Sequence, residues 1–415
     1  MRIGYACLTY GNITSNFRTI TKKYLTEDNL LDVIEHNLNS LEEIIDYNIQ
    51  NNIKLFRITS DLIPFGSSPL NMLKWDEIFK DRFHRIGVKI LNSNMRVSMH
   101  PGQYTVLNSP SDQVVFNAIE DLNYHVKILS LLNTGYSSKI ILHIGGVYGD
   151  KALAKSRFIN TFNRLEDRVR KRIIIENDDK SYNINDVMEI ASKIKTPVVF
   201  DNLHHRINNC EGTDAYWIRE AKKTWGCDDG IQKIHYSQQD VNKSPGSHSF
   251  TIDLNEFNDY IISNILDNID IMLEVKDKNL SAIKCNNLIL NNHIKSLEIE
   301  WSKYKYSVLE KSPYTYELIR SLLKNKEGYP VVEFYRFIDL ALSEKPDIGK
   351  SINAIEHIWG YFKDISSEDE KIKFLSLLRR FKEGKLSIRP IKNHLYNLSK
   401  KYNEDYLLSS YYFTL

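Results

Sequence analysis

The sequence predicts an α/β protein: a (β/α)8 TIM barrel followed by a small all-α C-terminal domain. Short apolar runs alternate with helical patterns eight times before residue 280. The runs are almost continuously apolar, as expected for parallel strands that are buried on both faces. From about residue 303 onward only amphipathic helical patterns remain. Because eight strand-helix alternations are typical of a closed barrel, we expect the larger domain to be one.

The predicted strands occupy residues 2–7, 53–60, 95–100, 139–146, 172–178, 197–202, 232–237 and 270–276. An open doubly wound sheet is the alternative, but its first strand should be followed by a glycine-rich phosphate loop. The stretch "YACLTYGN" after the first strand contains no such loop. We therefore favour the barrel and expect no dinucleotide cofactor.

The clearest helical pattern covers residues 28–52, where one stripe is apolar. Its members are Leu30, Val33, Ile34, Leu38, Leu41, Ile44 and Ile45. A second pattern covers residues 111–133, with Ser111 as its candidate N-cap. Near the C-terminus, Ser366 or Ser367 together with Glu370 forms a capping-box pattern.

The predicted organisation is a barrel over residues 1–280, a linker or helix over 281–302 and an all-helical domain over 303–415. Residues 301–415 hold 20 Lys and Arg against 15 Asp and Glu, whereas residues 1–300 hold 35 against 38. The basic tail indicates an anionic partner. Six basic residues there are candidates for phosphate contacts, although a solvated helix face is the alternative: Arg379, Arg380, Lys382, Lys385, Arg389 and Lys392.

The composition is that of an ordinary globular protein, with 42% hydrophobic and 26% charged residues. Four widely spaced cysteines without a CxxC pair predict a reduced, cytoplasmic setting. The first strand begins directly at the N-terminus, and no run reaches 18 apolar residues. We therefore expect a cytoplasmic, nucleoid-associated bacterial protein that is neither secreted nor membrane-spanning.

Polar side chains stand at the C-terminal ends of the predicted strands, which meet at the mouth of a barrel. In chain order they are Tyr5, Arg57 with Asp61, His100, His143, Glu176, Asp201 with His204, His235, and Glu274. A charged or unpaired polar group in an apolar strand costs several kcal/mol unless it is paired or coordinated. One such residue is usually a satisfied core group, but successive strands that all carry one predict a metal site.

Eight residues are the candidate ligands of divalent ions: His100, His143, Glu176, Asp201, His204, His235, His248 and Glu274. Their mixture of nitrogen and oxygen donors suits Mn²⁺ or Zn²⁺, with Mg²⁺ a further possibility. Glu176 and Glu274 are candidates for bridging ions, and two-metal sites with ions about 3.5–4 Å apart hydrolyse phosphate esters. The other histidines, His125 among them, are expected to be ordinary packing or surface residues.

Lys233 lies two residues before His235 and therefore on the same face of its strand. A buried lysine beside metal ligands has a lowered pKa, forms a salt bridge or is chemically modified, and the sequence leaves these three interpretations open. After His100, Pro101 and Gly102 break the strand and leave Gln103 and Tyr104 beyond the break.

Seven motifs occur in order: "FRITSDLIPFGSSP", "MHPGQY", "LHIGG", "IENDD", "FDNLHH", "IHYSQQD" and "PGSHSF". With them, residues 1 to about 280 resemble the UV damage endonucleases, which are metal-dependent (β/α)8 barrels. The resemblance implies incision of duplex DNA immediately 5′ to lesions such as cyclobutane pyrimidine dimers and 6-4 photoproducts, leaving a 3′-hydroxyl and a 5′-phosphate. It implies three divalent ions, typically manganese, held by the eight ligands already named.

The resemblance also implies roles for further residues. Lys233 falls where the family can carry a carboxylated lysine. Gln103 and Tyr104 match the pair that enters the duplex, and Tyr5 matches a residue beside the lesion pocket. The catalytic set that we predict consists of Glu176, Asp201, Lys233 and Glu274.

The sequence departs from the family at Gly66, Ser67 and Ser68, where some members read "ASH". A histidine near the active site is thus absent, which affects the expected lesion range and pH dependence. The tail from residue 303 resembles the YbgA-type helical domain of unassigned function. We expect that domain to contact nucleic acid or another repair protein, and the whole chain to be a monomer.

Two other functions remain open from the sequence. A metal-dependent sugar isomerase of the xylose-isomerase type shares the barrel and the divalent ions, but it needs no projecting Gln-Tyr turn. A non-catalytic lesion-binding protein would need no complete set of metal ligands.

Overall fold

The computed structural model describes residues 1–11, 16–265, 267–290 and 293–415. The chain forms two compact units. One is made of most of the residues up to Ile283, and the other of Lys284–Leu415 with two short segments from earlier in the chain. The boundaries at residues 280 and 302 stay a prediction. No helix in the described ranges is long and apolar enough to cross a membrane.

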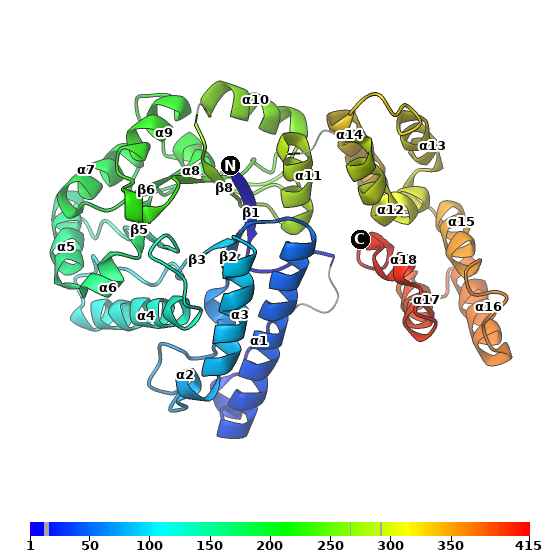
Figure 1. The fold of residues 1–415 in the computed structure, drawn as a ribbon, viewed down its shortest axis with the longest axis horizontal. Helices are drawn as coiled ribbons and strands as arrows, with labels where there is room; N and C mark the ends of the chain where they lie inside the picture. Colours follow the sequence, from blue (N-terminus) through cyan, green and yellow to red (C-terminus); the bar gives the residue numbers. More distant parts are fainter. Residues whose placement is uncertain (12–15, 266, 291–292) are drawn as a thin grey trace. The chain divides into compact units, whose positions relative to one another are not determined.

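Eight parallel strands close into a barrel in sequence order, which confirms the predicted fold (Figure 1). They are β1 (Arg2–Ala6), β2 (Leu55–Ile58), β3 (Arg96–Met99), β4 (Ile140–His143), β5 (Ile173–Glu176), β6 (Val198–Asp201), β7 (Lys233–Tyr236) and β8 (Asp270–Leu273). The predicted strands were longer at their ends. After β2, for example, the Thr59 side chain accepts a hydrogen bond from the Asp61 N–H and starts a 3-10 turn, η2 (Ser60–Leu62).

Helices cover the outside of the barrel. They are α1 (Glu27–Gln50), α2 (Trp75–Ile78), α3 (Lys80–Asn92), α4 (Asp112–Leu131), α5 (Lys151–Arg164), α6 (Asp167–Arg170), α7 (Ile184–Ile194), α8 (Asn202–Ile207), α9 (Asp214–Lys222), α10 (Leu254–Asn264) and α11 (Asn279–Leu290). The predicted stripe of α1 is buried except for Val33, which is half-buried. Ser111 precedes α4 as predicted, but its side chain accepts no capping hydrogen bond.

The N-terminal end of the barrel is closed by paired charges. Asp270 accepts hydrogen bonds from Arg96 at 3.0 Å and from Arg2 at 3.2 Å, and its side chain is fully buried. Lys139 forms an ion pair with Asp229, and Arg172 donates to three backbone carbonyls. Every charge named here therefore has a partner within the chain.

The C-terminal unit is helical, as predicted. Its elements are α12 (Ile294–Lys311), α13 (Pro313–Leu322), α14 (Val331–Ser343), α15 (Ile348–Trp359), α16 (Glu368–Lys382), α17 (Arg389–Lys401), α18 (Asp405–Leu408) and the 3-10 turn η4 (Tyr411–Phe413). Ser367, and not Ser366, forms the capping box with Glu370 at the start of α16. Trp359 and Phe374 stack with ring centroids 4.0 Å apart and join α15 to α16.

Candidate metal centre

The predicted ligands converge at the mouth because their strands end in register. His143, Glu176 and Asp201 are the last residues of β4, β5 and β6. His143 lies directly opposite Glu176, and Asp201 lies opposite His235 on the next strand. In a parallel barrel neighbouring strands end at the same face, so these side chains are brought together.

Glu176 is the centre of the cluster, with 1% of its surface exposed. Its Oε1 lies 2.7 Å from Nδ1 of His235 and 3.7 Å from Nδ1 of His204. Its Oε2 lies 3.2 Å from Nε2 of His100 and 3.7 Å from Nε2 of His143. One carboxylate thus faces four imidazoles supplied by four different parts of the barrel.

Two overlapping groups within this cluster have ligand atoms within 4.8 Å of one another. One consists of His100, His143 and Glu176, and the other of Glu176, Asp201 and His235. Because Glu176 belongs to both, its two oxygens are placed to bridge neighbouring ions.

The remaining predicted ligands surround these groups. Oε1 of Glu274 lies 3.2 Å from Nδ1 of His235, and Glu274 also forms an ion pair with Arg57. Oδ1 of Asp201 lies 3.7 Å from Nδ1 of His204. His248 forms an isolated β-bridge with Gln239 and is close enough to Glu274 to lower the pKa of its carboxyl.

Three buried polar atoms of the cluster have no hydrogen-bond partner among the described residues: Nδ1 of His143, Oδ2 of Asp201 and Nε2 of His235. Leaving a buried donor or acceptor unsatisfied costs about 1–3 kcal/mol. Three such atoms in one cluster are expected where a bound ion completes the coordination. This donor set of imidazoles and carboxylates fits divalent transition metals.

The backbone orients two of the histidines for metal binding. Nδ1 of His100 lies 3.0 Å from the Pro101 carbonyl oxygen, and Nδ1 of His204 lies 2.9 Å from that of Asn177. A carbonyl only accepts, so each Nδ1 carries the proton and donates it. Nε2 of His100, which is neutral, is then left with a lone pair, the usual arrangement of a metal-bound histidine, and His204 takes the same form once it loses its second proton.

The two glutamates are held ionised by their neighbours. Burial opposes ionisation of Glu176, but His235, His143 and His100 outweigh it and lower the pKa of its carboxyl well below the usual value. Burial likewise opposes ionisation of Glu274, and Arg57 and His235 lower its pKa. Both carboxylates are therefore negatively charged and ready to bind cations.

Asp201 and two histidines respond differently. Burial raises the pKa of Asp201, and the nearby glutamates add to the increase. Burial lowers the pKa of His100 to about 4, so it is neutral at physiological pH. Burial also acts to lower the pKa of His204, but Asp201 and the two glutamates outweigh it and raise that pKa to about 9.

Lys233 is 1% exposed and forms no ion pair with any described residue. Burial, followed by the positive charges of Arg96 and Arg57, lowers the pKa of its amine well below the usual value. Of the three interpretations left open by the sequence, the salt bridge is thus contradicted. A neutral amine beneath the cluster remains, available for chemical modification.

The turn after β3 projects from the mouth. Gln103 and Tyr104 are both exposed, and Tyr104 shows 69% of its surface. The Thr105 N–H donates to the Gly102 carbonyl at 2.9 Å and closes the turn. A Cβ at Gly102 would lie 2.4 Å from the exposed Tyr104 ring, so a larger residue there would displace that ring.

Tyr5 is not brought to the cluster. It is fully buried, and its hydroxyl donates to Oδ1 of Asn48 in α1 at 2.7 Å. Its neighbour Ala6 packs instead with Leu55 and Met272 of adjacent strands. Because side chains alternate along a strand, Tyr5 faces the helical layer and Ala6 the barrel interior. This position gives no support to a DNA-contacting role for Tyr5.

Two residues outside the predicted set support the centre. Arg57, noted only as a polar strand end, holds Glu274 through their ion pair. The Asn177 side chain donates to the Asp201 carbonyl at 3.1 Å and accepts from the Asp201 N–H at 2.9 Å. Asn177 lies directly after β5 in the "IENDD" motif, and this position is the sequence feature that could have identified it.

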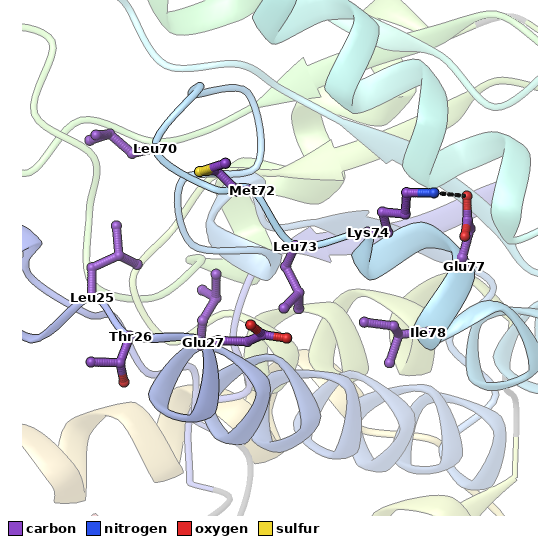
Figure 2. A pocket seen from close by; sticks show the side chains of 10 residues that line it. Leu25, Thr26, Glu27, Leu70, Met72, Leu73, Lys74, Glu77 and Ile78 are labelled. Atoms are coloured by element: carbon purple, nitrogen blue, oxygen red, sulfur yellow. Dashed lines mark ion pairs between the residues drawn. The ribbon is translucent and has the colours of Figure 1, made fainter.

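A separate hollow of about 670 Å³ lies between the start of α1 and residues 70–78 (Figure 2). Its walls are largely apolar, with Leu30, Leu73 and the exposed Met72 among them. The Lys74–Glu77 ion pair at 3.5 Å is visible at its edge (Figure 2). The lining includes no histidine or cysteine, so it offers no second cluster of metal ligands.

Comparisons with known proteins find matches for both parts of the chain. Residues 1–302 match the family described as "UV-endonuclease UvdE", and residues 305–415 match "Protein of unknown function (DUF1722)". A UV DNA damage endonuclease of Clostridium perfringens is 42% identical over 392 residues, covering 91% of this chain and 92% of that protein. One from Bacillus cereus strain 03BB102 is 33% identical over 295 residues, covering 68% of this chain and 93% of its own.

A solved structure is also similar. The crystal structure of SacUVDE superposes with a TM-score of 0.66 at 36% sequence identity, covering 70% of this chain and 98% of that one. The match over residues 1–302 spans well over half of the chain. The chain therefore belongs to the UV-endonuclease family.

Proposed function

We propose that the chain nicks duplex DNA immediately 5′ to UV lesions, such as cyclobutane pyrimidine dimers and 6-4 photoproducts. Hydrolysis of the phosphodiester would leave a 3′-hydroxyl and a 5′-phosphate. The observation that carries the proposal is the cluster around Glu176, with its three unpartnered buried atoms, whose member His100 is followed at once by the exposed Gln103–Tyr104 turn. Family membership supports an endonuclease over the sugar-isomerase and non-catalytic alternatives.

The eight mouth residues would hold three divalent ions, with Mn²⁺ favoured over Zn²⁺ and Mg²⁺. When bound, such ions lower the pKa of water and polarise a phosphate. Either Asp201 or Glu176 would orient the attacking hydroxide. Arg57 would keep Glu274 ionised and fixed, since their ion pair lowers the pKa of the Glu274 carboxyl.

Lys233 is proposed to be carboxylated. A carbamate forms when a neutral amine adds to CO₂ and releases a proton. Burial favours the neutral amine, and the positive charges of Arg96 and Arg57 favour both the neutral amine and the negatively charged product. Protein equilibrated with ¹³C-bicarbonate should show a carbamate carbon by NMR. The signal should be absent in Lys233→Met, and its absence in the wild type would refute the modification.

The exposed turn would supply lesion selectivity. Extruding a damaged or unstacked dinucleotide costs less than extruding an intact one by about a few kcal/mol. Gln103 and Tyr104 would fill the gap that is left and hold the duplex bent. Their exposure in the free protein is compatible with insertion into DNA.

The deciding experiment uses a labelled duplex with one defined pyrimidine dimer, incubated with Mn²⁺, Mg²⁺ or chelator. We expect one cut directly 5′ to the dimer in Mn²⁺, and no cut with chelator or with Glu176→Gln. Undamaged duplex and an aldose serve as control substrates. Aldose turnover without nicking, or equal nicking of both duplexes, would contradict the proposal.

The C-terminal unit is proposed to contact DNA phosphates, with the whole chain acting as a monomer on nucleoid DNA in the cytoplasm. Arg379, Arg380 and Arg389 are exposed and form no ion pair with any described residue. They lie at the end of α16 and the start of α17. By contrast, Lys392 is buried against Glu310 at 2.8 Å, which contradicts its predicted phosphate contact.

Reversing the charge of these three arginines to Glu tests this interaction. A protein that neutralises Z phosphates loses affinity with salt at a slope of about −0.9Z, so the slope should become shallower by about one for each phosphate that is no longer neutralised. The matched control reverses Arg320, Lys324 and Lys326, three other basic residues of this unit. Equal slopes for the two triple variants would exclude the arginine surface.

A further inference from the structure

Three side chains on one face of α4 reach the loops that carry the mouth residues. Asp121, Tyr124 and His125 are spaced i, i+3 and i+4, so they lie side by side on the helix. All three are buried, and His125 is fully so. A histidine expected to be an ordinary packing residue therefore lies inside a polar network.

The network forms hydrogen bonds at both ends of the turn that follows β3. On the far side, Thr105 Oγ1 donates to Oδ2 of Asp121 at 2.7 Å. On the near side, Ser60 Oγ donates to the His100 carbonyl at 2.7 Å. Nδ1 of His125 donates to the Asp121 carbonyl at 2.6 Å, so its Nε2, 2.9 Å from Ser60 Oγ, is an acceptor that shares the single Ser60 hydroxyl proton with the His100 carbonyl.

Tyr124 holds the neighbouring loop after β2. Its hydroxyl donates to the Ser60 carbonyl at 2.8 Å and accepts from the Ile63 N–H at 3.1 Å. Its ring packs on Gly66, where a Cβ would lie 2.2 Å away. Ser60 is thus fixed through its backbone by Tyr124 and through its side chain by His125.

We propose that Asp121 and His125 are positioning residues, which hold the turn at residues 101–105 rigid and present Gln103 and Tyr104 in one orientation. The inference rests on the proposed function, since it explains how the exposed pair recognises a lesion. A turn that is already ordered in the free protein loses less conformational entropy on binding, which increases its affinity for the lesion that fits it. Between its anchors the turn buries Pro101, whereas Gln103 and Tyr104 are exposed, so the two anchors hold the ends of the segment that carries the exposed pair.

Two substitutions at Thr105 distinguish the effect of side-chain shape from the effect of the hydrogen bond. Thr105→Val keeps the side-chain shape and removes the hydroxyl, whereas Thr105→Ser keeps the hydroxyl. Ser130→Ala is the control on the same helix, since Ser130 Oγ donates only to the Val126 carbonyl within α4. Binding is measured in the Glu176→Gln background, so that no DNA is cut.

The readout is the ratio of dissociation constants for undamaged and dimer-containing duplex. We expect Thr105→Val to lower this ratio about tenfold, the factor that one hydrogen bond to a charged group supports. Thr105→Ser and Ser130→Ala should stay within about twofold of the parent, as expected where that bond is kept. Ser60→Ala should act like Thr105→Val at the other anchor.

Amide hydrogen exchange of residues 100–106 provides a readout that does not depend on lesion recognition. It should be faster in Thr105→Val and unchanged in Thr105→Ser. Thr105→Val could instead lower the melting temperature and leave both the ratio of dissociation constants and the amide exchange unchanged. That result would show that the network only stabilises the fold, and it would overturn the inference. Equal binding of both duplexes by the parent would instead refute the proposed function, while the exchange data still decide whether α4 orders the turn.

Discussion

The two ends of the barrel both bury charged residues, but only one end satisfies them. At the N-terminal end, Asp270 is paired with Arg2 and Arg96 within hydrogen-bonding distance. At the mouth, Asp201 and His235 are equally buried, yet each has an atom without a hydrogen-bond partner among the described residues. Burial of charge is therefore no sign of function by itself, whereas several unpartnered polar atoms gathered in one cluster of imidazoles and carboxylates indicate a cation-binding site.

The difference in charge pairing between the two ends reflects their different roles. A paired charge at the base stabilises the closed barrel and requires nothing further. An incompletely paired cluster at the mouth lowers the stability of the empty protein and regains it when cations bind. Substitutions at the two ends should therefore separate activity from stability.

Glu176→Gln should have the largest effect, and it should be on activity. Because Glu176 contacts four histidines, we expect incision to fall by more than the about 100-fold that loss of an outer partner of a metal ligand causes. Single-turnover incision of a dimer-containing duplex measures it. Asp270→Asn, assayed on its folded fraction, should cut at nearly the parent rate, and an equal loss in both variants would erase the distinction between the ends.

Asp270→Asn should have the largest effect on stability. Removing this carboxylate leaves Arg96 buried without its counter-charge, which costs about 3–5 kcal/mol. Urea unfolding measures the change. Glu189→Gln, which breaks surface ion pairs with the half-buried Lys155 and the exposed Lys193, should cost less than about 1 kcal/mol. If Asp270→Asn also lowered the free energy of unfolding by less than about 1 kcal/mol, the ion pairs of Asp270 would not stabilise the N-terminal end of the barrel.

The metal-free mouth should lose stability as pH rises. The pKa of His204 is about 9 in the fold, above its ordinary value of 6.5. Its contribution is therefore complete below pH 6.5 and lost as pH rises through 9, by at most about 3 kcal/mol. Unfolding of chelated protein at pH 6 and pH 9.5 measures it. His204→Gln should flatten the difference, and an unchanged pH dependence would mean that His204 is not held by the carboxylates.

Adding Mn²⁺ should have the smallest of these effects, an increase in stability that depends on the mouth of the barrel and not on its base. Cations that bind only the folded state stabilise it by about 2.7 kcal/mol at one hundred times their dissociation constant. Melting curves with and without chelator measure this gain. It should persist in Glu189→Gln and disappear in Glu176→Gln. A gain retained by Glu176→Gln would place the ions away from the mouth.

Sequence patterns predicted the eight strands, the stripe of α1 and the residues at the strand ends. These follow from local rules, because burial on both faces requires apolar strands and parallel strands end at one face. The same patterns predicted little about α4. Nothing near His125 in the chain distinguishes it from a packing residue, since Ser60 and Thr105 lie on other loops.

Tyr5 and Lys233 show where sequence reasoning reached its limit. Their positions in the strands were read correctly, but the pairing of their polar atoms depends on residues far along the chain. Tyr5 donates to Asn48 in α1, and Lys233 lies near both arginines and carboxylates yet forms no ion pair with any described residue. Such pairings depend on the closure of the barrel, which no local pattern encodes.

The sequence by itself determined the order of strands and the kinds of atoms delivered to the mouth. The spacing of His100, His143, Glu176, Asp201 and His235 already implied one cluster, because each follows from one β-α repeat. Only the tertiary structure decided which of those atoms find partners and which remain open. Hydrogen bonding and burial depend on distances across the closed barrel, and these distances exist only once all eight strands have come together.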